Sequence, residues 1–498
     1  MPGKLPIFYS ALLLTGVNLL LRLVGTSFQV YLSGKIGPAG IGLLQLVMSV
    51  GSLAMIAGMA GIRTASMYLT AEELGKKRNE NVPWVLSGCF QYSILCSGII
   101  AVLLIMFSSE IAEFWIGDIG TAGAIRLFGG FLPSICLCGV MTGYFTAEGK
   151  IGMLAGIGIL EQLVSLGVTM AGLSLWAGTD ALRAIKCVIS GSGVGSILTL
   201  CILVTFRNME RGKIGSKKSV RHPLLQTAIP LAVADILKSG ITTTESLMVP
   251  KRLEKNVTIE NPLAAFGLVS GMVFPVLMFP ACVIYGLAEL LIPELARCTA
   301  SGSEERICYL VRRSLKTVML YGLFFSGFLF LLSEPLCLWL YQNSGAGECL
   351  KLYSILVPML YCDAITDAMT KGMGQQKTCV RYNILSSAMD VVLLYVLLPR
   401  YGMEGYFFSF AITHLFNFIL SLRRLLRITQ VKISTSLPIL SIVSEVSAVF
   451  VACHINSPVI SVIVFITVFF CILILFSVIE KEDAKWIRGM LRFQTKPA

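Results

Sequence analysis

Residues 458–479 read PVISVIVFITVFFCILILFSVI, a stretch without a single charged side chain. A helix of about 20 apolar residues spans the hydrocarbon core of a bilayer, which is about 30 Å thick, so this stretch predicts a transmembrane helix. The whole chain agrees: 55% of its 498 residues are hydrophobic and 14% are charged, whereas soluble domains carry about 25% charged residues. The composition therefore excludes a water-soluble enzyme.

Thirteen further blocks of similar length and composition precede this stretch, separated by charged or Pro/Gly-rich segments. Together the fourteen blocks are residues 7–33, 41–69, 84–107, 122–147, 151–176, 184–206, 224–249, 264–292, 310–332, 349–373, 379–398, 403–424, 435–454 and 458–479. We predict an all-α polytopic membrane protein with about 14 transmembrane helices. Pro275 and Pro280 are expected to kink the eighth block, because proline removes a backbone hydrogen bond and clashes with the preceding turn.

A basic interruption after the sixth block divides the chain. The predicted parts are an N-terminal six-helix lobe (1–206), a basic cytoplasmic linker (207–223), a C-terminal six-helix lobe (224–424), an additional transmembrane helix pair (435–479) and a cytoplasmic tail (480–498). Two short segments, 143–150 and 370–377, echo each other at matching places and suggest that the lobes are pseudo-symmetric. Transporters built from such repeats hold their substrate near mid-membrane.

The distribution of Lys and Arg predicts the orientation. Most of them fall in tails and loops on one side, and cytoplasmic loops are the ones enriched in basic residues, so both termini are expected in the cytoplasm. The first block is too long for a signal peptide and carries Arg22 at its centre, which favours a retained helix. The net charge of +12 thus reflects orientation in the membrane, and no nucleic acid is expected as a partner.

Motifs for enzymatic chemistry are not found in the sequence. Residues 143–150 come nearest to a phosphate loop, but they have one residue too many between the glycines and lack Ser or Thr after Lys150. The sequence has three histidines and no H-E-x-x-H motif. We expect no cofactor and no metal site, and a transporter in place of an enzyme.

Ionisable residues inside the blocks are the candidate site, because each costs about 2.5–3.5 kcal/mol at a helix centre unless it is paired or hydrated. Arg22, Arg63 and Lys238 are the candidate substrate-binding residues, and basic groups around a cavity suit phosphate or carboxylate. Alternatives stay open: Arg22 could form a buried ion pair, Arg63 could extend to the inner surface, and Asp235 could neutralise Lys238. Candidate coupling or structural acids are Glu161, Asp235, Glu245, Glu289 and Asp390.

Several segments resemble the stage V sporulation protein B family of the multidrug, oligosaccharidyl-lipid and polysaccharide (MOP) exporter superfamily. They are Arg22-Leu-Val-Gly25, residues 31–42 (YLSGKIGPAGIG), Gly143-Tyr-Phe with Glu161-Gln162, residues 249–253 (VPKRL) and residues 401–405 (YGMEG). The sequence departs from the family pattern at Glu245, where relatives often carry Asp, and at Ala147-Glu148, which replaces a glycine-glutamine pair.

The resemblance implies a flippase of the bacterial cytoplasmic membrane that moves undecaprenyl-pyrophosphate-linked sugars by alternating access. The implied cargo is lipid II or a related precursor of spore cortex peptidoglycan, and Arg22 matches the first-helix Arg that lipid II flippases place in a cationic cavity. Implied partners are the lipid-linked anionic sugar, membrane lipids and cell-wall synthases. The alternatives are a multidrug extruder of the same superfamily, which would need an acidic, aromatic-lined cavity, and a non-transporting scaffold for cell-wall synthases.

Overall fold

The protein is helical throughout the part that the computed structural model describes, which is residues 7–76, 78–209, 221–431, 436–455, 457–476 and 478. Within these residues, nine helices are long and apolar enough to cross a membrane, or up to eleven when each of two bent helix pairs counts as one span. The predicted all-α membrane fold is confirmed, and the number of 14 spans stays a prediction. Most of the basic linker (210–220) and the tail (480–498) lie outside the described residues.

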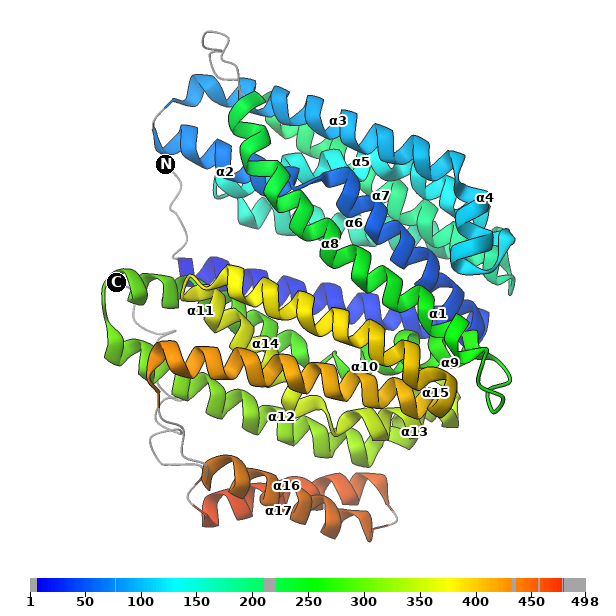
Figure 1. The fold of residues 1–498 in the computed structure, drawn as a ribbon, viewed down its shortest axis with the longest axis vertical. Helices are drawn as coiled ribbons and strands as arrows, with labels where there is room; N and C mark the ends of the chain where they lie inside the picture. Colours follow the sequence, from blue (N-terminus) through cyan, green and yellow to red (C-terminus); the bar gives the residue numbers. More distant parts are fainter. Residues whose placement is uncertain are drawn as a thin grey trace. The chain divides into compact units, whose positions relative to one another are not determined.

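The helices follow the apolar blocks of the sequence (Figure 1). In chain order they are α1 (Ile7–Met59), α2 (Ile62–Gly75), α3 (Val82–Met106), α4 (Ser108–Glu110), α5 (Ala122–Ala147), α6 (Ile151–Gly172), α7 (Ala181–Met209), α8 (Arg221–Leu253), α9 (Pro262–Gly267), α10 (Phe274–Leu277), α11 (Ala281–Ala300), α12 (Glu304–Tyr341), α13 (Ser344–Ser354), α14 (Val357–Gly372), α15 (Gln376–Thr429), α16 (Ser436–Cys453) and α17 (Pro458–Leu475). Short 3-10 or π segments lie at Asn79–Asn81, Ile111–Ile116, Ile119–Thr121, Leu173–Ala177 and Leu268–Val273.

Two long helices each join two predicted blocks across a kink: α1 contains 7–33 and most of 41–69, and α15 contains 379–398 and 403–424. In α1 the kink is at Gly37, which has a φ of 70° and is followed by Pro38. In α15 it is at Gly402, with φ of 55° and ψ of −130°. Glycine has no Cβ and adopts these angles at little cost, and proline cannot donate the hydrogen bond that would continue the helix. The helix axis therefore changes direction at Gly37 and at Gly402 without a long loop.

The kink expected in the eighth block is confirmed. Pro262–Leu277 and Ala281–Thr299 meet at an angle of 62° around the break between α10 and α11. Pro275 lies in α10 and Pro280 immediately precedes α11. The Pro280 carbonyl, just before α11, accepts hydrogen bonds from the Val283 amide at 3.3 Å and from the Tyr321 hydroxyl at 2.8 Å. The Tyr321 hydroxyl thus connects the break to α12.

The chain packs as two compact units. Unit 1 comprises Met1–Met272 and Ser387–Ser409, and unit 2 comprises Val273–Ser386 and Phe410–Ala498. Within unit 1, α8 packs on α1. The two six-helix lobes expected at 1–206 and 224–424 stay a prediction. The hydrophobic core of unit 1 joins Leu32 and Ile41 of α1 to Leu394 and Leu398 of α15.

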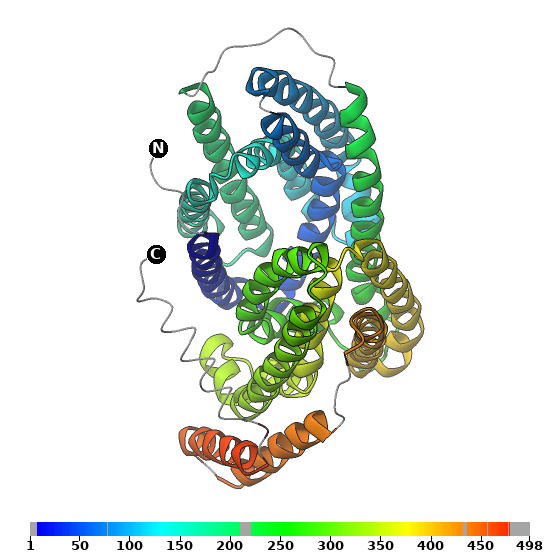
Figure 2. The same cartoon turned by 90° about the vertical axis from the view of Figure 1, so that its left-hand side faces the viewer.

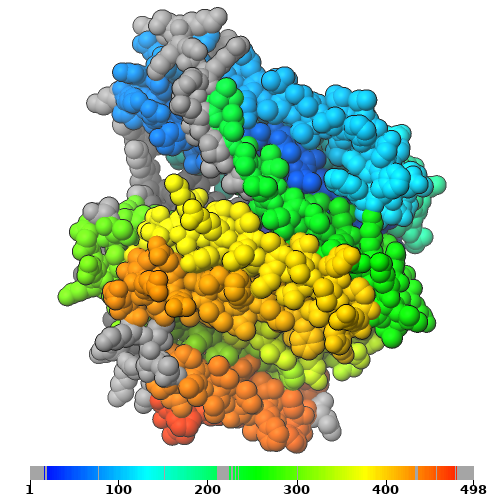
Figure 3. Space-filling view, viewed as in Figure 1, coloured from blue at the N-terminus to red at the C-terminus, as the bar shows by residue number. Residues whose placement is uncertain are grey.

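The C-terminal helix pair α16 and α17 lies side by side in both ribbon views (Figure 1, Figure 2). The rings of Phe465 and Phe469 stack at 5.6 Å, and Phe324 of α12 lies 6.0 Å from Phe465. Gly327 lets Phe465 approach α12, since a Cβ at this position would lie 2.5 Å from the ring. In the space-filling view, the atoms of the pair form one continuous orange and red layer (Figure 3). Aromatic packing thus attaches the pair to α12 inside unit 2.

Candidate functional site

Unit 1 contains a cavity of about 340 Å³ that combines charged, hydroxyl and apolar side chains. Its wall is formed by α1, α2, α5, α6 and α7. The lining residues are Met48, Ser52, Met55, Met59, Arg63, Phe128, Ile135, Cys138, Gly139, Thr142, Glu161, Ser192 and Ser196. Two residues expected from the sequence, Arg63 and Glu161, are therefore brought to one cavity. A mostly apolar wall with a few polar groups is typical of ligand sites.

Arg63 reaches the cavity because the chain breaks just before it. Ala60 and Gly61 adopt φ values of 43° and 72°, which end α1 and begin α2 in a new direction. Gly143 allows α5 to lie against this turn, because a Cβ there would come within 2.4 Å of the Arg63 carbonyl oxygen. The Arg63 side chain is exposed and forms no ion pair with any residue that the structure describes. Its guanidinium is therefore available to a ligand.

Glu161 contributes the opposite charge to the cavity from α6. It accepts a hydrogen bond from the Thr199 side chain on α7. The two helices approach closely because a Cβ on Gly195 would lie 3.2 Å from the Glu161 carbonyl oxygen. No ion pair joins Arg63 and Glu161, although both line the cavity. The cavity thus keeps separate positive and negative groups.

The hydroxyl and thiol groups of the cavity wall are held by neighbouring backbone. Cys138 Sγ donates to the Ser196 carbonyl at 3.1 Å, and Thr142 Oγ1 donates to the Cys138 carbonyl at 2.8 Å. Ser196 Oγ donates to the Gly193 carbonyl at 2.8 Å. These bonds use the hydroxyl hydrogens and leave lone pairs for a ligand, and the Ser196 hydroxyl also lies 3.2 Å from the Ser134 hydroxyl. The wall can accept hydrogen bonds from sugar hydroxyls while Arg63 supplies a donor.

The other expected basic residues do not line this cavity. Arg22 is half-buried on α1 and already interacts with another group of the protein. Lys238 and Asp235 are both exposed on α8, and no ion pair joins them. Glu289 is exposed on α11 in unit 2. Substrate binding by Arg22 and Lys238 therefore stays a prediction.

A second polar cluster in unit 1 brings together Glu245 and Asp390, on α8 and α15. Ser387 donates a side-chain hydrogen bond to Glu245, and the two carboxylates are close enough to repel each other. Ser409, fully buried beyond the Gly402 kink, donates to Asp390 Oδ1 at 2.6 Å. Glu245 Oε1 is buried and has no hydrogen-bond partner among the residues that the structure describes. The kink places residues from both halves of α15 around one pair of acids.

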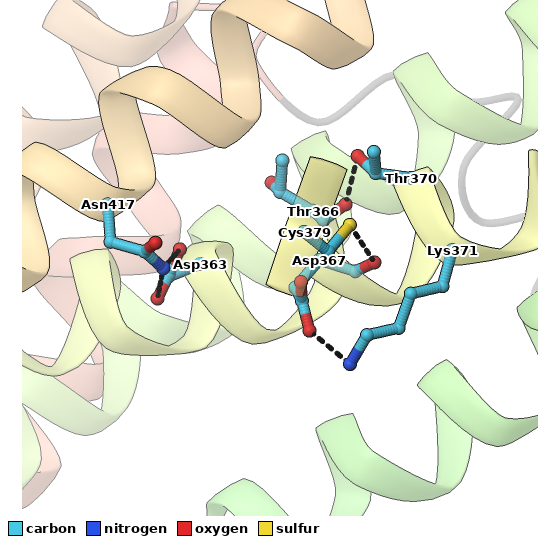
Figure 4. Close-up of polar contacts among 7 residues, drawn as sticks. All are labelled: Asp363, Thr366, Asp367, Thr370, Lys371, Cys379 and Asn417. Atoms are coloured by element: carbon cyan, nitrogen blue, oxygen red, sulfur yellow. Dashed lines mark hydrogen bonds and ion pairs between the residues drawn. The ribbon is translucent and has the colours of Figure 1, made fainter. Parts of the chain in front are cut away.

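Unit 2 has a polar pair of its own, formed by Asp363 of α14 and Asn417 of α15 (Figure 4). Asn417 Nδ2 donates to both carboxylate oxygens of Asp363 at 3.0 Å. Asn417 is 6% exposed, and its Oδ1 has no hydrogen-bond partner in the described part of the chain. One turn along α14, Asp367 forms an ion pair with Lys371 at 2.6 Å. The Asp363 carboxylate therefore depends on a neutral donor.

The sequence does not single out Asn417, Ser387 and Ser409, because they carry no charge. Each is a polar residue inside or beside an apolar block, and that was the available signal. Serine and asparagine are common inside membrane helices, where they hydrogen-bond to backbone or to other helices. Only the packing of α8, α14 and α15 shows which of them faces an acid.

The Asp363 and Asn417 pair provides a test of this packing. We expect Asn417→Ala to lower the free energy of unfolding by about 1.5–3 kcal/mol, because it removes a hydrogen bond to a carboxylate. Asp363→Asn in the Asn417→Ala background should cost much less than it does alone. Thermal unfolding of the unmodified protein and the three variants of this double-mutant cycle measures the coupling. Additive losses would show that the two side chains do not interact.

Comparison with known proteins supports the fold. The MatE family model matches residues 15–171. The chain is 20% identical to "Stage V sporulation protein B" of Bacillus subtilis (strain 168) over 399 residues, which covers 78% of this chain and 77% of that protein. It is also 20% identical to "Sporulation protein YkvU" of Bacillus subtilis (strain 168) over 283 residues, covering 54% of this chain and 62% of the relative.

Solved structures agree with these sequence matches. The lipid II flippase MurJ in an inward closed conformation aligns with a TM-score of 0.73 and 15% identity, covering 93% of this chain and 98% of that one. An inward-facing multidrug resistance MATE family transporter of the MOP superfamily aligns with a TM-score of 0.67 and 14% identity, covering 84% and 98%. The resemblance inferred from the sequence is confirmed, and the fold is that of MOP-superfamily membrane transporters.

Proposed function

We propose that the chain is a flippase that carries a lipid-linked anionic sugar across the membrane. The observation that carries the proposal is the Arg63 guanidinium, which lines the cavity of unit 1 without an ion pair to any described residue. A guanidinium binds phosphate oxygens with a planar fork of donors, so a phosphate or pyrophosphate is its natural ligand. The similarity to a sporulation protein and the fold shared with a lipid II flippase support the same substrate class.

The size of the cavity limits which part of the substrate it takes. At about 340 Å³ it lies near the lower end of the range of about 300–1,000 Å³ for ligand pockets. In this proposal the cavity of unit 1 holds the pyrophosphate and the adjoining sugar, while the polyprenyl tail stays in lipid. Ser192 and Ser196 accept from sugar hydroxyls, and the Met and Phe side chains contact the apolar sugar face.

The driving force in this proposal comes from the membrane potential and from a coupled cation. An inside-negative potential favours outward movement of an anion by about 2.3 kcal/mol per charge per 100 mV. Glu245 and Asp390 are the coupling acids, because two neighbouring carboxylates in a membrane protein are stabilised by a shared proton or cation. In the same proposal, the lipid-linked cargo is a precursor for spore cortex synthesis. Cell-wall synthases are the partners of the protein.

Reconstitution tests the proposed activity. The full chain in liposomes should move a fluorescent undecaprenyl-pyrophosphate-linked sugar to the opposite leaflet, where an added reagent quenches it. A glycolipid with the same tail and sugar but no pyrophosphate is the matched control, and we expect it to cross no faster than in empty liposomes. Equal movement of the two lipids would rule out recognition of the pyrophosphate by Arg63.

A multidrug extruder is the second candidate, because Glu161 and Phe128 line the same cavity with three methionines. An acidic and aromatic wall suits cationic aromatic drugs. This function predicts uptake of such a drug into inside-out vesicles and a loss of uptake in Glu161→Gln. A scaffold for cell-wall synthases moves neither the lipid nor the drug, so the same preparation separates the three functions.

A further inference from the structure

A groove of about 500 Å³ lies on α5, apart from the cavity of Arg63. It is lined by Gly123, Arg126, Leu127, Gly130 and Phe131, none of which lines the other cavity. The three- and four-residue spacing puts all five on one face of the helix. Gly130 is exposed, and a Cβ there would have no atom within 4 Å. The glycines thus leave a hollow on the surface of unit 1.

Two cations border this groove. Arg126 Nε donates to Ser108 Oγ at 2.7 Å and Nη2 donates to Ser109 Oγ at 3.0 Å, which orients the guanidinium and leaves Nη1 for another acceptor. Lys186 Nζ, from α7, lies 3.0 Å from the position of a Cβ on Gly123, so its ammonium lies over the groove. Neither cation is in an ion pair with a residue of the described ranges. Their combined charge favours an anion.

The positions of Arg126 and Lys186 near the ends of their helices suit contact with a lipid headgroup. With 26 residues, α5 is about 39 Å long, which exceeds the hydrocarbon core of about 30 Å, so its ends reach the headgroup region. Arg126 and Lys186 lie in the first two turns of α5 and α7, and long basic side chains extend toward the interface. Leu127, Gly130 and Phe131 continue the groove toward the acyl-chain region with apolar surface.

We propose that this groove binds an anionic phospholipid of the bilayer, with its phosphate between Arg126 and Lys186. One acyl chain lies over Leu127, Gly130 and Phe131. The choice of an anionic lipid follows from the two uncompensated cations and from the lining, which contains no acidic side chain. The groove shares no lining residue with the Arg63 cavity.

Lipid binding to the purified full chain tests the proposal. In neutral detergent, we expect phosphatidylglycerol to raise the unfolding temperature at lower concentration than phosphatidylcholine with identical acyl chains. Arg126→Gln with Lys186→Gln should weaken phosphatidylglycerol binding about 30-fold, because each basic residue near an anionic surface contributes about 1 kcal/mol and 1.4 kcal/mol corresponds to tenfold. Phosphatidylcholine binding should not change. Native mass spectrometry counts the retained lipid.

Lys186→Gln alone is compared with Arg183→Gln as its matched control, because each removes one positive charge from the same end of α7. Arg183 forms an ion pair with Asp180 at 3.2 Å and does not line the groove. An equal loss of binding in this control would show diffuse electrostatic attraction and overturn the proposal. So would Arg126-dependent binding of undecaprenyl phosphate without binding of phosphatidylglycerol, which would make the groove a cargo site.

A second variant tests the acyl-chain part without removing charge. Gly130→Leu fills the hollow in a helical position with open space around it, so the fold should tolerate it. We expect it to reduce retention of phosphatidylglycerol severalfold while leaving the unfolding temperature of the lipid-free protein within a few degrees. Unchanged retention in Gly130→Leu would contradict the seat that we assign to the acyl chain.

Discussion

Arg63→Ala should slow the flipping of a pyrophosphate-linked sugar about 10- to 100-fold in reconstituted liposomes. A hydrogen bond to a charged group contributes about 1.5–3 kcal/mol, and each 1.4 kcal/mol is a factor of ten. Arg63 is the one basic residue that lines the cavity of unit 1 in the described part of the chain, so no neighbouring cation on that wall replaces it. Arg63→Lys should retain an intermediate rate, because it keeps the charge but loses the planar fork of donors.

The stability of the same variants shows whether the effect is on binding. Because Arg63 makes no ion pair with any described residue, Arg63→Ala should change the free energy of unfolding by no more than about 0.5 kcal/mol. Arg183→Ala, at an exposed arginine outside the cavity, should flip the substrate at the rate of the unmodified protein. If Arg63→Ala flips equally fast, the guanidinium does not bind the cargo.

Gly267→Ala should destabilise the protein by more than about 3 kcal/mol, which is beyond the usual cost of about 1–3 kcal/mol for overpacking. A Cβ on Gly267 would lie 2.0 Å from the Pro38 carbonyl oxygen and 2.5 Å from the Gly42 amide nitrogen. Both are backbone atoms, so no side chain can rotate to make room. Gly42 faces the same contact, with its Cβ position 2.3 Å from the Leu263 carbonyl oxygen. The measurement is thermal unfolding, together with the yield of monodisperse protein.

Gly240→Ala on α8 is the matched control for the helix crossing. Its Cβ would meet no atom within 4 Å, and alanine is favoured over glycine inside a helix by about 0.5–1 kcal/mol. The two glycine-to-alanine changes should therefore have opposite signs. Similar unfolding temperatures for both variants would mean that α1 and α9 do not cross at Gly42 and Gly267.

Part of the site could be predicted because a charge inside an apolar block is visible in the sequence. Arg63 and Glu161 were found in this way, and the structure brings both to one cavity. Glu245 and Asp390 were found as separate acids, whereas their common cluster with Ser409 depends on the Gly402 kink of α15. Asn417 carries no charge and was missed, although it donates to both oxygens of Asp363.

The sequence by itself determined that the chain is helical and lies in a membrane, because the free energy of inserting a segment is close to a sum over its own side chains. Stretches such as residues 458–479 need no partner to show this. Only the tertiary structure decided which polar residues share a cavity and which are exposed. Which polar residues come together depends on contacts between residues that are far apart in the sequence, such as Gly42 with Gly267 and Arg63 with Gly143. At these contacts two backbones approach closely because glycine has no side chain.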